Sequence, residues 1–152
     1  MRRVLQFLTT YIAKGVLESK LNVISNAFRK DEMLHFDDVP AAPGVYIMVA
    51  KECKFIYPKK KSPVFYIGTS NNLKRRLKDH LRLYKLAQTD YKKNKMWNYS
   101  RYNYAVAFGA DIYYMRITGR ENEKSLESKA MEGFYDRYGA IPVGNGAFSF
   151  RQ

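Results

Sequence analysis

Apolar residues recur at helical spacing near the start of the chain. This spacing predicts one helix over residues 4–16 and a second over residues 21–28. The acidic, proline-containing stretch that follows predicts a linker, because proline interrupts both helices and strands. We therefore expect a helical N-terminal extension over residues 1–40 and a separate folded domain over residues 41–152.

Farther along the chain, the pattern changes to short runs of β-branched and aromatic residues. Such runs predict strands over residues 44–50, 64–67 and 110–118. Stripes of apolar residues at helical spacing predict long helices over residues 72–87 and 121–138. Because the first two strands follow each other closely, we expect them to form an antiparallel hairpin with a long loop. The predicted fold class is α+β, with a small three-stranded antiparallel sheet flanked by helices.

Positive charge is concentrated in one part of this pattern. Residues 51–104 hold 15 Lys or Arg and 3 Asp or Glu, a net charge of +12, whereas the other residues hold 12 and 11. Such an uneven distribution favours a polyanionic partner, either nucleic acid or an anionic membrane. Aromatic residues lie among these cations, and rings that stack on bases favour nucleic acid. The alternative is a solvated basic face with tyrosines in the core.

Composition excludes several classes of protein. The chain has 152 residues, 46% of them apolar, which is enough for one compact core, and no apolar run long enough to cross a membrane. A single cysteine, Cys53, excludes an internal disulfide framework, and two histidines do not complete a zinc site with it. The first apolar stretch is interrupted by polar residues and lacks a small-residue cleavage site. We therefore expect no secretion and a cytoplasmic location.

The strongest chemical signal is the run from Tyr66 to His80. A tyrosine ends a predicted strand, Gly68 turns the chain, and cationic residues follow on a predicted helix. This order can bring a phenol, backbone N–H groups and a guanidinium to one phosphate-sized position.

The same run resembles the second signature of the GIY-YIG nuclease family, which is intact here as Tyr66-Ile67-Gly68. The first signature is present as Gly44-Val45-Tyr46, with valine in place of isoleucine. Arg76 stands ten residues after the second tyrosine, where the family has an arginine, and His80 follows one turn later. With a helical glutamate and a late asparagine, the matches span residues 44–145.

This resemblance implies a DNA endonuclease that hydrolyses phosphodiester bonds with one divalent metal ion, Mg²⁺ or Mn²⁺, and acts on duplex DNA. Tyr66 would be the general base, or would polarise the attacking water together with Tyr46. Arg76 would hold the scissile phosphate, and Glu127 would bind the metal. Asn145 would tie the sheet to the site, because an amide both donates and accepts hydrogen bonds.

Helical phase selects the arginine and the glutamate. At about 100° per residue, Arg76 lies about 60° from Leu73 of the buried stripe, whereas Arg75 lies about 160° away on the solvent side. Glu127 lies within the inward arc of its helix and Glu132 lies outside it, so Glu127 is the expected metal ligand. The alternative for Glu127 is an ordinary salt bridge to Arg76.

Two further residues have alternative interpretations. His80 could relay a proton or hydrogen-bond the phosphate, or it could be an ordinary histidine on the helix surface. Trp97 and its neighbouring tyrosines could stack on bases, or they could form a small satellite core.

Nineteen residues separate Tyr46 from Tyr66, more than in the minimal family module, and this extra length is rich in lysine. We expect an extended hairpin there that touches DNA. Residues 51–61 and 92–101 also lack the charged partners that a structural role for their cations would require. The predicted DNA-binding residues are Lys59, Lys60, Lys61, Lys74, Arg75, Lys92, Lys93, Lys95 and Arg101.

The sequence leaves two other functions open. One is a non-catalytic DNA-binding module that retains the GIY-YIG fold, and the other is an RNA-binding or ribosome-associated basic protein. Target specificity, nicking as against double-strand cleavage, and oligomeric state are not predicted.

Overall fold

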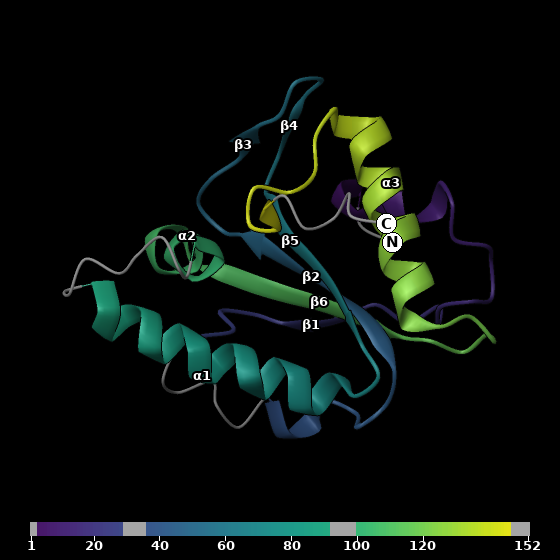
Figure 1. The fold of residues 1–152 in the computed structure, drawn as a ribbon, viewed down its shortest axis with the longest axis horizontal. Helices are drawn as coiled ribbons and strands as arrows, with labels where there is room; N and C mark the ends of the chain where they lie inside the picture. Colours follow the sequence, from purple (N-terminus) through teal and green to yellow (C-terminus); the bar gives the residue numbers. More distant parts are fainter. Residues whose placement is uncertain (1–2, 29–35, 92–99, 147–152) are drawn as a thin grey trace.

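The computed structural model describes residues 3–28, 36–91 and 100–146. Its main element is a four-stranded sheet in the order β1-β6-β2-β5, in which every neighbouring pair is antiparallel (Figure 1). The strands of this sheet are β1 (Asn22–Ile24), β2 (Gly44–Ala50), β5 (Val64–Ser70) and β6 (Ala110–Arg116).

Helices cover both faces of the sheet. Helices α1 and α2 pack on one face, and α3 packs on the other together with the 3₁₀ helix η1 (Figure 1). The bounds of these helices are η1 (Arg3–Thr9), α1 (Leu73–Tyr91), α2 (Ser100–Phe108) and α3 (Glu123–Tyr138). The α+β class, the antiparallel hairpin of β2 with β5 and both long helices are therefore confirmed.

Local chemistry explains the ends of α3. The side chain of Asn122 accepts a hydrogen bond from the backbone N–H of Ser125, which satisfies one of the free donors at the start of the helix. At the other end, Gly139 adopts φ 83°, a left-handed conformation that glycine reaches without a steric penalty.

The prediction of three strands is wrong, because residues 22–24 form β1 and pair with β6. The apolar spacing that predicted a helix over residues 21–28 fits this arrangement as well. Val23 and Ile24 are β-branched and suit a strand. Asn26 adopts φ 49°, which ends any helical path, and its N–H donates to Asp111 on the neighbouring strand.

The helical N-terminal extension is not confirmed. In the described part of this segment, residues 3–9 form the 3₁₀ helix η1 and residues 36–38 form one 3₁₀ turn, but there is no α-helix. After η1 the chain continues through turns to an isolated bridge between Leu17 and Ile117. Gly15 has φ 88°, which a right-handed helix cannot accommodate. The division of the chain at residue 40 stays a prediction.

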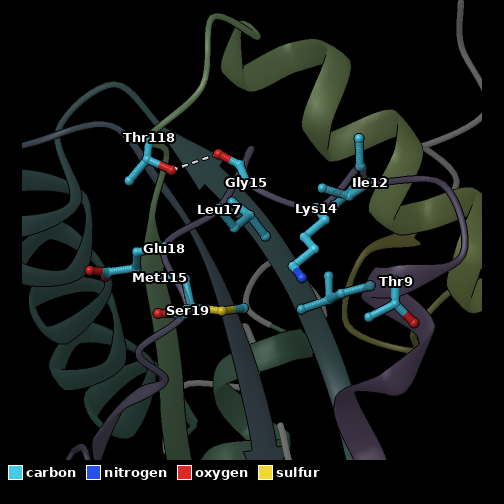
Figure 2. A pocket seen from close by; sticks show the side chains of 11 residues that line it. Thr9, Ile12, Lys14, Gly15, Leu17, Glu18, Ser19, Met115 and Thr118 are labelled. Atoms are coloured by element: carbon cyan, nitrogen blue, oxygen red, sulfur yellow. Dashed lines mark hydrogen bonds between the residues drawn. The ribbon is translucent and has the colours of Figure 1, made fainter.

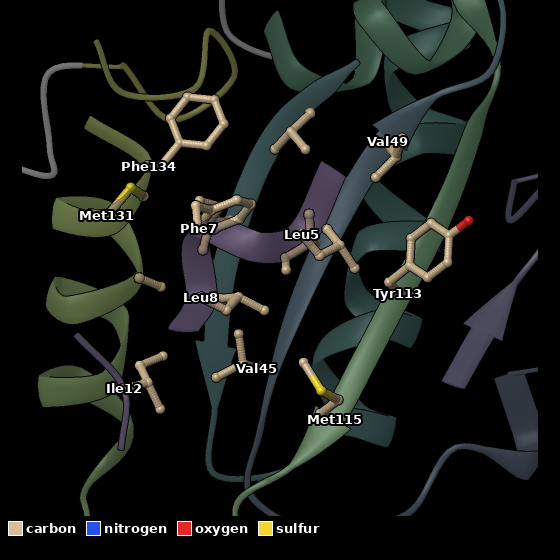
Figure 3. Packing of buried hydrophobic residues seen from close by; sticks show 14 of the residues in the cluster. Leu5, Phe7, Leu8, Ile12, Val45, Val49, Tyr113, Met115, Met131 and Phe134 are labelled. Atoms are coloured by element: carbon tan, nitrogen blue, oxygen red, sulfur yellow. The ribbon is translucent and has the colours of Figure 1, made fainter. Parts of the chain in front are cut away.

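The core has one half on each face of the sheet. On the α3 face, η1 inserts Phe7 and Leu8 between α3 and the strands, where Phe7 meets Phe134 edge-on at 5.2 Å between ring centroids (Figure 3). On the other face, Leu73 and Leu77 of α1 pack against the alternate side chains of β2. Because successive side chains of β2 point to opposite faces of the sheet, this strand contributes residues to both halves of the core.

Helix α2 was not predicted, and the extended hairpin expected in the long connection forms a small sheet of its own. Helix α2 occupies residues 100–108, where the sequence shows no clear period, and it buries Tyr102 and Ala105. A separate two-stranded sheet of β3 (Phe55–Ile56) and β4 (Lys61–Ser62) stands in the long connection between β2 and β5. No helix in the described part of the chain is both long and apolar enough to cross a bilayer.

Candidate functional site

The two signature tyrosines lie on the same face of neighbouring strands. Tyr46 of β2 pairs with Gly68 of β5, and Met48 pairs with Tyr66. A β-carbon on Gly68 would lie 2.4 Å from the Tyr46 ring, so only glycine lets that ring lie across β5. The centroids of the Tyr46 and Tyr66 rings are 6.0 Å apart.

A bulge in β5 sets the direction of Tyr66. The register shifts so that Val49 faces Val64, which leaves Phe65 as an extra residue. Phe65 and Tyr66 consequently both pack in the cluster on the α1 face, instead of alternating between faces. Bulges of this kind often re-aim side chains next to functional sites.

Helix α1 brings Arg76 to the tyrosines. Its Nε donates a hydrogen bond of 3.2 Å to the Tyr46 hydroxyl, and the side chain is half-buried. Arg75, by contrast, is exposed and donates to Asn71. The placement of the two arginines predicted from helical phase is confirmed, and the phase is fixed by the buried stripe that begins at Leu73.

His80 is fully buried between two tyrosines. Its Nε2 lies 2.7 Å from the Tyr46 hydroxyl and its Nδ1 lies 2.7 Å from the Tyr102 hydroxyl. The alternative of an ordinary surface histidine is therefore wrong. Both ring nitrogens are hydrogen-bonded to these hydroxyls, so neither is left to bind a phosphate directly in this arrangement.

Burial holds the pKa of His80 well below its ordinary value, and the charges of Arg76 and Arg101 act in the same direction. A neutral imidazole has a single N–H, so it donates to one tyrosine and accepts from the other. Burial also raises the pKa of Tyr46 well above the usual value, and Arg76 only partly opposes this effect. The buried chain from Tyr102 through His80 to Tyr46 is therefore uncharged at neutral pH.

Tyr66 has a different partner. Nη1 of Arg101 donates a hydrogen bond of 2.9 Å to the Tyr66 hydroxyl, and the guanidinium carbon lies 4.4 Å from the centroid of the Tyr66 ring. The sequence predicted Arg101 as a DNA-binding residue of a basic segment and counted Tyr102 only among the aromatic residues that could stack on bases. The structure brings both to the tyrosine cluster through α2, and their sequence spacing carries no signal that could have shown this.

Glu127 approaches the cluster from α3, on the other side of the edge strand β5. It is half-buried, and burial raises the pKa of its carboxyl group, whereas the charge of Arg76 opposes that rise. Glu132 is exposed, as its helical phase predicted. The structure describes the side chains of both Glu127 and Arg76, and their charged groups form no ion pair within 4 Å. The salt-bridge alternative is therefore wrong.

Asn145 holds the C-terminal segment against the edge of β5. Its side-chain oxygen accepts from the backbone N–H of Ile67 at 3.0 Å, and its Nδ2 donates to the carbonyl of Ile67 at 2.8 Å. The neighbouring Gly144 donates to the carbonyl of Phe65 at 2.7 Å. These bonds occupy the free edge of β5 on both sides of Tyr66, so the amide fixes the strand that carries the tyrosine.

The predicted DNA-binding residues are distributed unevenly. Lys74 and Arg75 lie in the first turn of α1, next to Arg76. Lys59 donates through Nζ to the carbonyl of Asp136 at 2.8 Å, and Lys60 lies 5.4 Å above the Tyr138 ring. These two lysines therefore have structural contacts, although neither contact is to a charged group. The expected lack of charged partners is wrong for Lys51, whose Nζ lies 3.7 Å from a carboxylate oxygen of Asp111. Lys92, Lys93, Lys95 and Trp97 lie outside the described residues.

A cavity of about 760 Å³ lies apart from this cluster, between the segment of residues 8–19 and β6 (Figure 2). Apolar side chains such as Leu8 and Met115 dominate its wall, and Lys14 extends over it. None of the predicted site residues lines it.

The fold and this cluster together define a class: an α+β domain with two tyrosines, an arginine and a glutamate at one sheet edge. Residues 42–106 match the family model described as the GIY-YIG catalytic domain. The match confirms the resemblance seen in the sequence over this segment, and that domain implies a nuclease with a nucleic-acid substrate. No curated protein and no solved structure matched the chain.

Proposed function

We propose that this chain is a DNA endonuclease that hydrolyses phosphodiester bonds with one divalent metal ion. The observation that carries the proposal is the cluster at the edge of the sheet. Tyr46, Tyr66 and Arg76 lie together there, and Glu127 is close enough for the charge of Arg76 to act on its carboxyl group. These groups come from β2, β5, α1 and α3.

Tyr66 is the proposed general base. In its deprotonated form it takes the proton of the attacking water while the water oxygen bonds to phosphorus, and the leaving oxygen departs with the electron pair of the broken bond. Arg101 donates a hydrogen bond to the Tyr66 hydroxyl and so holds the tyrosine oxygen in place. Tyr46 is less suited to be the base, because burial raises its pKa and both His80 and Arg76 contact its hydroxyl.

Tyr46 and His80 are proposed as positioning residues. The Tyr46 hydroxyl holds Nε of Arg76, so the remaining guanidinium nitrogens are those that can face a phosphate. His80 fixes the Tyr46 hydroxyl from the buried side, and Tyr102 fixes His80 in turn. A guanidinium held in this way is pre-organised to stabilise the charge that develops on the phosphate in the transition state.

Glu127 is the proposed metal ligand. Among the described residues, no group of three or more His, Cys, Asp or Glu is placed to hold a metal ion. A single carboxylate still fits Mg²⁺ or Mn²⁺, because such ions are commonly held by one or two carboxylates with water and substrate phosphates. When bound, the metal would neutralise charge on the phosphate and on the leaving oxygen.

Duplex DNA is the proposed substrate. Lys74 and Arg75 lie beside Arg76 at the start of α1, where a backbone that reaches the tyrosines would also meet them. The lysines of residues 59–61 are proposed to meet the duplex farther away. The cytoplasmic location stays a prediction from the single cysteine.

Nicking of supercoiled plasmid, with and without Mg²⁺, tests the proposal. We expect Mg²⁺-dependent conversion of the plasmid by the wild-type chain and none by the Tyr66→Phe variant. A chain that shifts the plasmid on a gel but never cuts it, with Mg²⁺ or with Mn²⁺, would be a non-catalytic DNA-binding module. Cleavage of an RNA duplex in preference to the plasmid would contradict the DNA assignment.

A further inference from the structure

The connection between β2 and β5 folds into a small hairpin of its own. Strand β3 pairs with β4 in register, with Phe55 opposite Ser62 and Ile56 opposite Lys61. The hairpin rises beside the C-terminal end of α3, away from the four-stranded sheet (Figure 1). The family signatures and the proposed chemistry do not involve it, and the proposed function gives it only a duplex contact through residues 59–61.

One face of this hairpin is anchored to the body of the protein. The Phe55 ring lies 6.1 Å from the Phe65 ring and 5.3 Å from the Tyr104 ring, measured between centroids. The hydroxyl of the buried Tyr57 donates to the carbonyl of Val64 at 2.6 Å. The residues on both sides of Ile56 therefore fix its backbone, and Ile56 cannot turn inward without breaking these contacts.

The other face presents Ile56 to solvent. Its side chain is 82% exposed, which is the largest exposure among the large apolar residues that the structure describes. Isolated apolar residues on a surface are common. This one, however, stands opposite the exposed Lys61, and no acidic residue occurs from Cys53 to Ser62, whereas Lys54 and residues 59–61 are basic.

An exposed isoleucine that is held rigidly and surrounded by lysines resembles the surfaces with which proteins bind a DNA groove. Lysines pair with the phosphates that flank a groove. Apolar side chains such as isoleucine contact thymine methyl groups or wedge between base steps. A protein partner would more commonly meet a larger apolar patch with aromatic residues at its centre.

We propose that the β3–β4 hairpin is a DNA-contacting arm in which Ile56 meets base edges in a groove and Lys61 meets an adjacent phosphate. This inference rests on the proposed DNA substrate. Lys61 precedes Tyr66 by five residues, so at about 3.3 Å per residue the two lie at most roughly 17 Å apart. That distance corresponds to about five base pairs of duplex, so the arm would contact the DNA near the cleaved phosphate.

Equilibrium titrations of a labelled DNA duplex at several salt concentrations, without added metal, test the arm. The variants are Ile56→Ala and Lys61→Gln. The matched control is Val23→Ala, which removes an exposed β-branched residue from β1 at the opposite edge of the sheet. Thermal unfolding of each variant checks that the fold is retained, and plasmid nicking by the same samples reports the proposed activity separately.

We expect Ile56→Ala to weaken binding roughly tenfold with an unchanged slope of log K against log salt, because an apolar contact releases no counterions. Lys61→Gln should flatten that slope by about 0.9, and Val23→Ala should match the wild type. If Ile56→Ala binds as tightly as the wild type while the wild type still nicks plasmid, the arm is overturned and the nuclease assignment stands. If the wild type neither binds nor cuts DNA, both are overturned.

Discussion

The two faces of the sheet differ in the chemistry of their buried residues. On the α3 face, β2 contributes Val45, Ile47 and Val49 to an apolar cluster, which helix α3 closes with Phe134. On the α1 face, the alternate residues of β2 include Tyr46, whose buried hydroxyl is held by a histidine and an arginine. Both faces are packed with apolar side chains, and the α1 face adds a buried chain of hydrogen bonds from Tyr102 through His80 to Tyr46.

This difference indicates which buried residues serve the reaction and which serve mainly to stabilise the fold. Buried polar groups are costly unless every donor and acceptor has a partner, so a buried tyrosine–histidine chain is kept only where its hydrogen bonds are made. The cluster on the α3 face is mostly apolar, and burial of apolar surface is the dominant favourable contribution to folding. We therefore expect substitutions in the polar cluster of the α1 face to reduce activity and substitutions in the apolar cluster of the α3 face to reduce stability.

The largest expected effect is on the α1 face. Tyr66→Phe removes the proposed base, and Arg76→Ala removes the group proposed to hold the phosphate. Each should lower the cleavage rate by about 10²–10⁴ fold, because proton transfer and positioned charge contribute on that scale. Arg75→Ala is the matched control for Arg76, since it removes an exposed arginine from the same helical turn.

Single-turnover cleavage at saturating enzyme measures these rates, and Arg75→Ala should mainly weaken binding. Full activity in Tyr66→Phe would rule out the tyrosine as general base.

Phe134→Ala probes the α3 face. Phe134 is fully buried and packs edge-on against Phe7 and Tyr57. Its removal should lower the free energy of unfolding by about 3–5 kcal/mol through lost burial and the cavity left behind. Urea unfolding measures this loss, and the cleavage rate should stay near the wild-type rate where the variant is still folded. A folded but inactive Phe134→Ala variant would show that the two faces are not separable.

The sequence predicted most of this arrangement where the signal was local. Runs of β-branched and aromatic residues over residues 44–50 and 64–67 placed the two tyrosines on neighbouring strands. The stripe from Leu73 selected Arg76 over Arg75, because helical phase decides which side chain faces the sheet. The inward phase of Glu127 was predicted for the same reason.

The errors have a tertiary cause. Residues 22–24 satisfy a helical apolar period, but the open edge of β6 pairs with them, and pairing outweighs weak local preference. Arg101 and Tyr102 reach the site only because α2 packs beside α1, which no spacing in the sequence reports. Lys59 likewise gained a structural contact from a helix end far along the chain.

A smaller effect follows from the neutral His80. Its folded-state pKa lies well below the usual value near 6.5, so above about pH 6.5 the imidazole is neutral in both states. As the pH falls below 6.5, the unfolded chain binds a proton that the folded chain excludes. The free energy of unfolding should then fall by about 1.4 kcal/mol per pH unit until the folded-state pKa is reached.

Urea unfolding at pH 7, 6 and 5 should show this slope in the wild type and a shallower slope in His80→Gln. If that variant does not fold, NMR titration of the two histidines of the wild-type chain supplies the same answer. An imidazole that titrates near pH 6.5 at position 80 would contradict the buried, neutral assignment.

The central claim is that the chemistry lies at the edge where the two faces meet, with Glu127 as the metal ligand. The most direct measurement is Mg²⁺-dependent plasmid nicking by Glu127→Gln and Glu132→Gln, which replace a half-buried and an exposed carboxylate of the same helix. We expect Glu127→Gln to bind DNA but not to cut it at any Mg²⁺ concentration, and Glu132→Gln to cut like the wild type. An inactive Glu132→Gln beside an active Glu127→Gln would contradict the account.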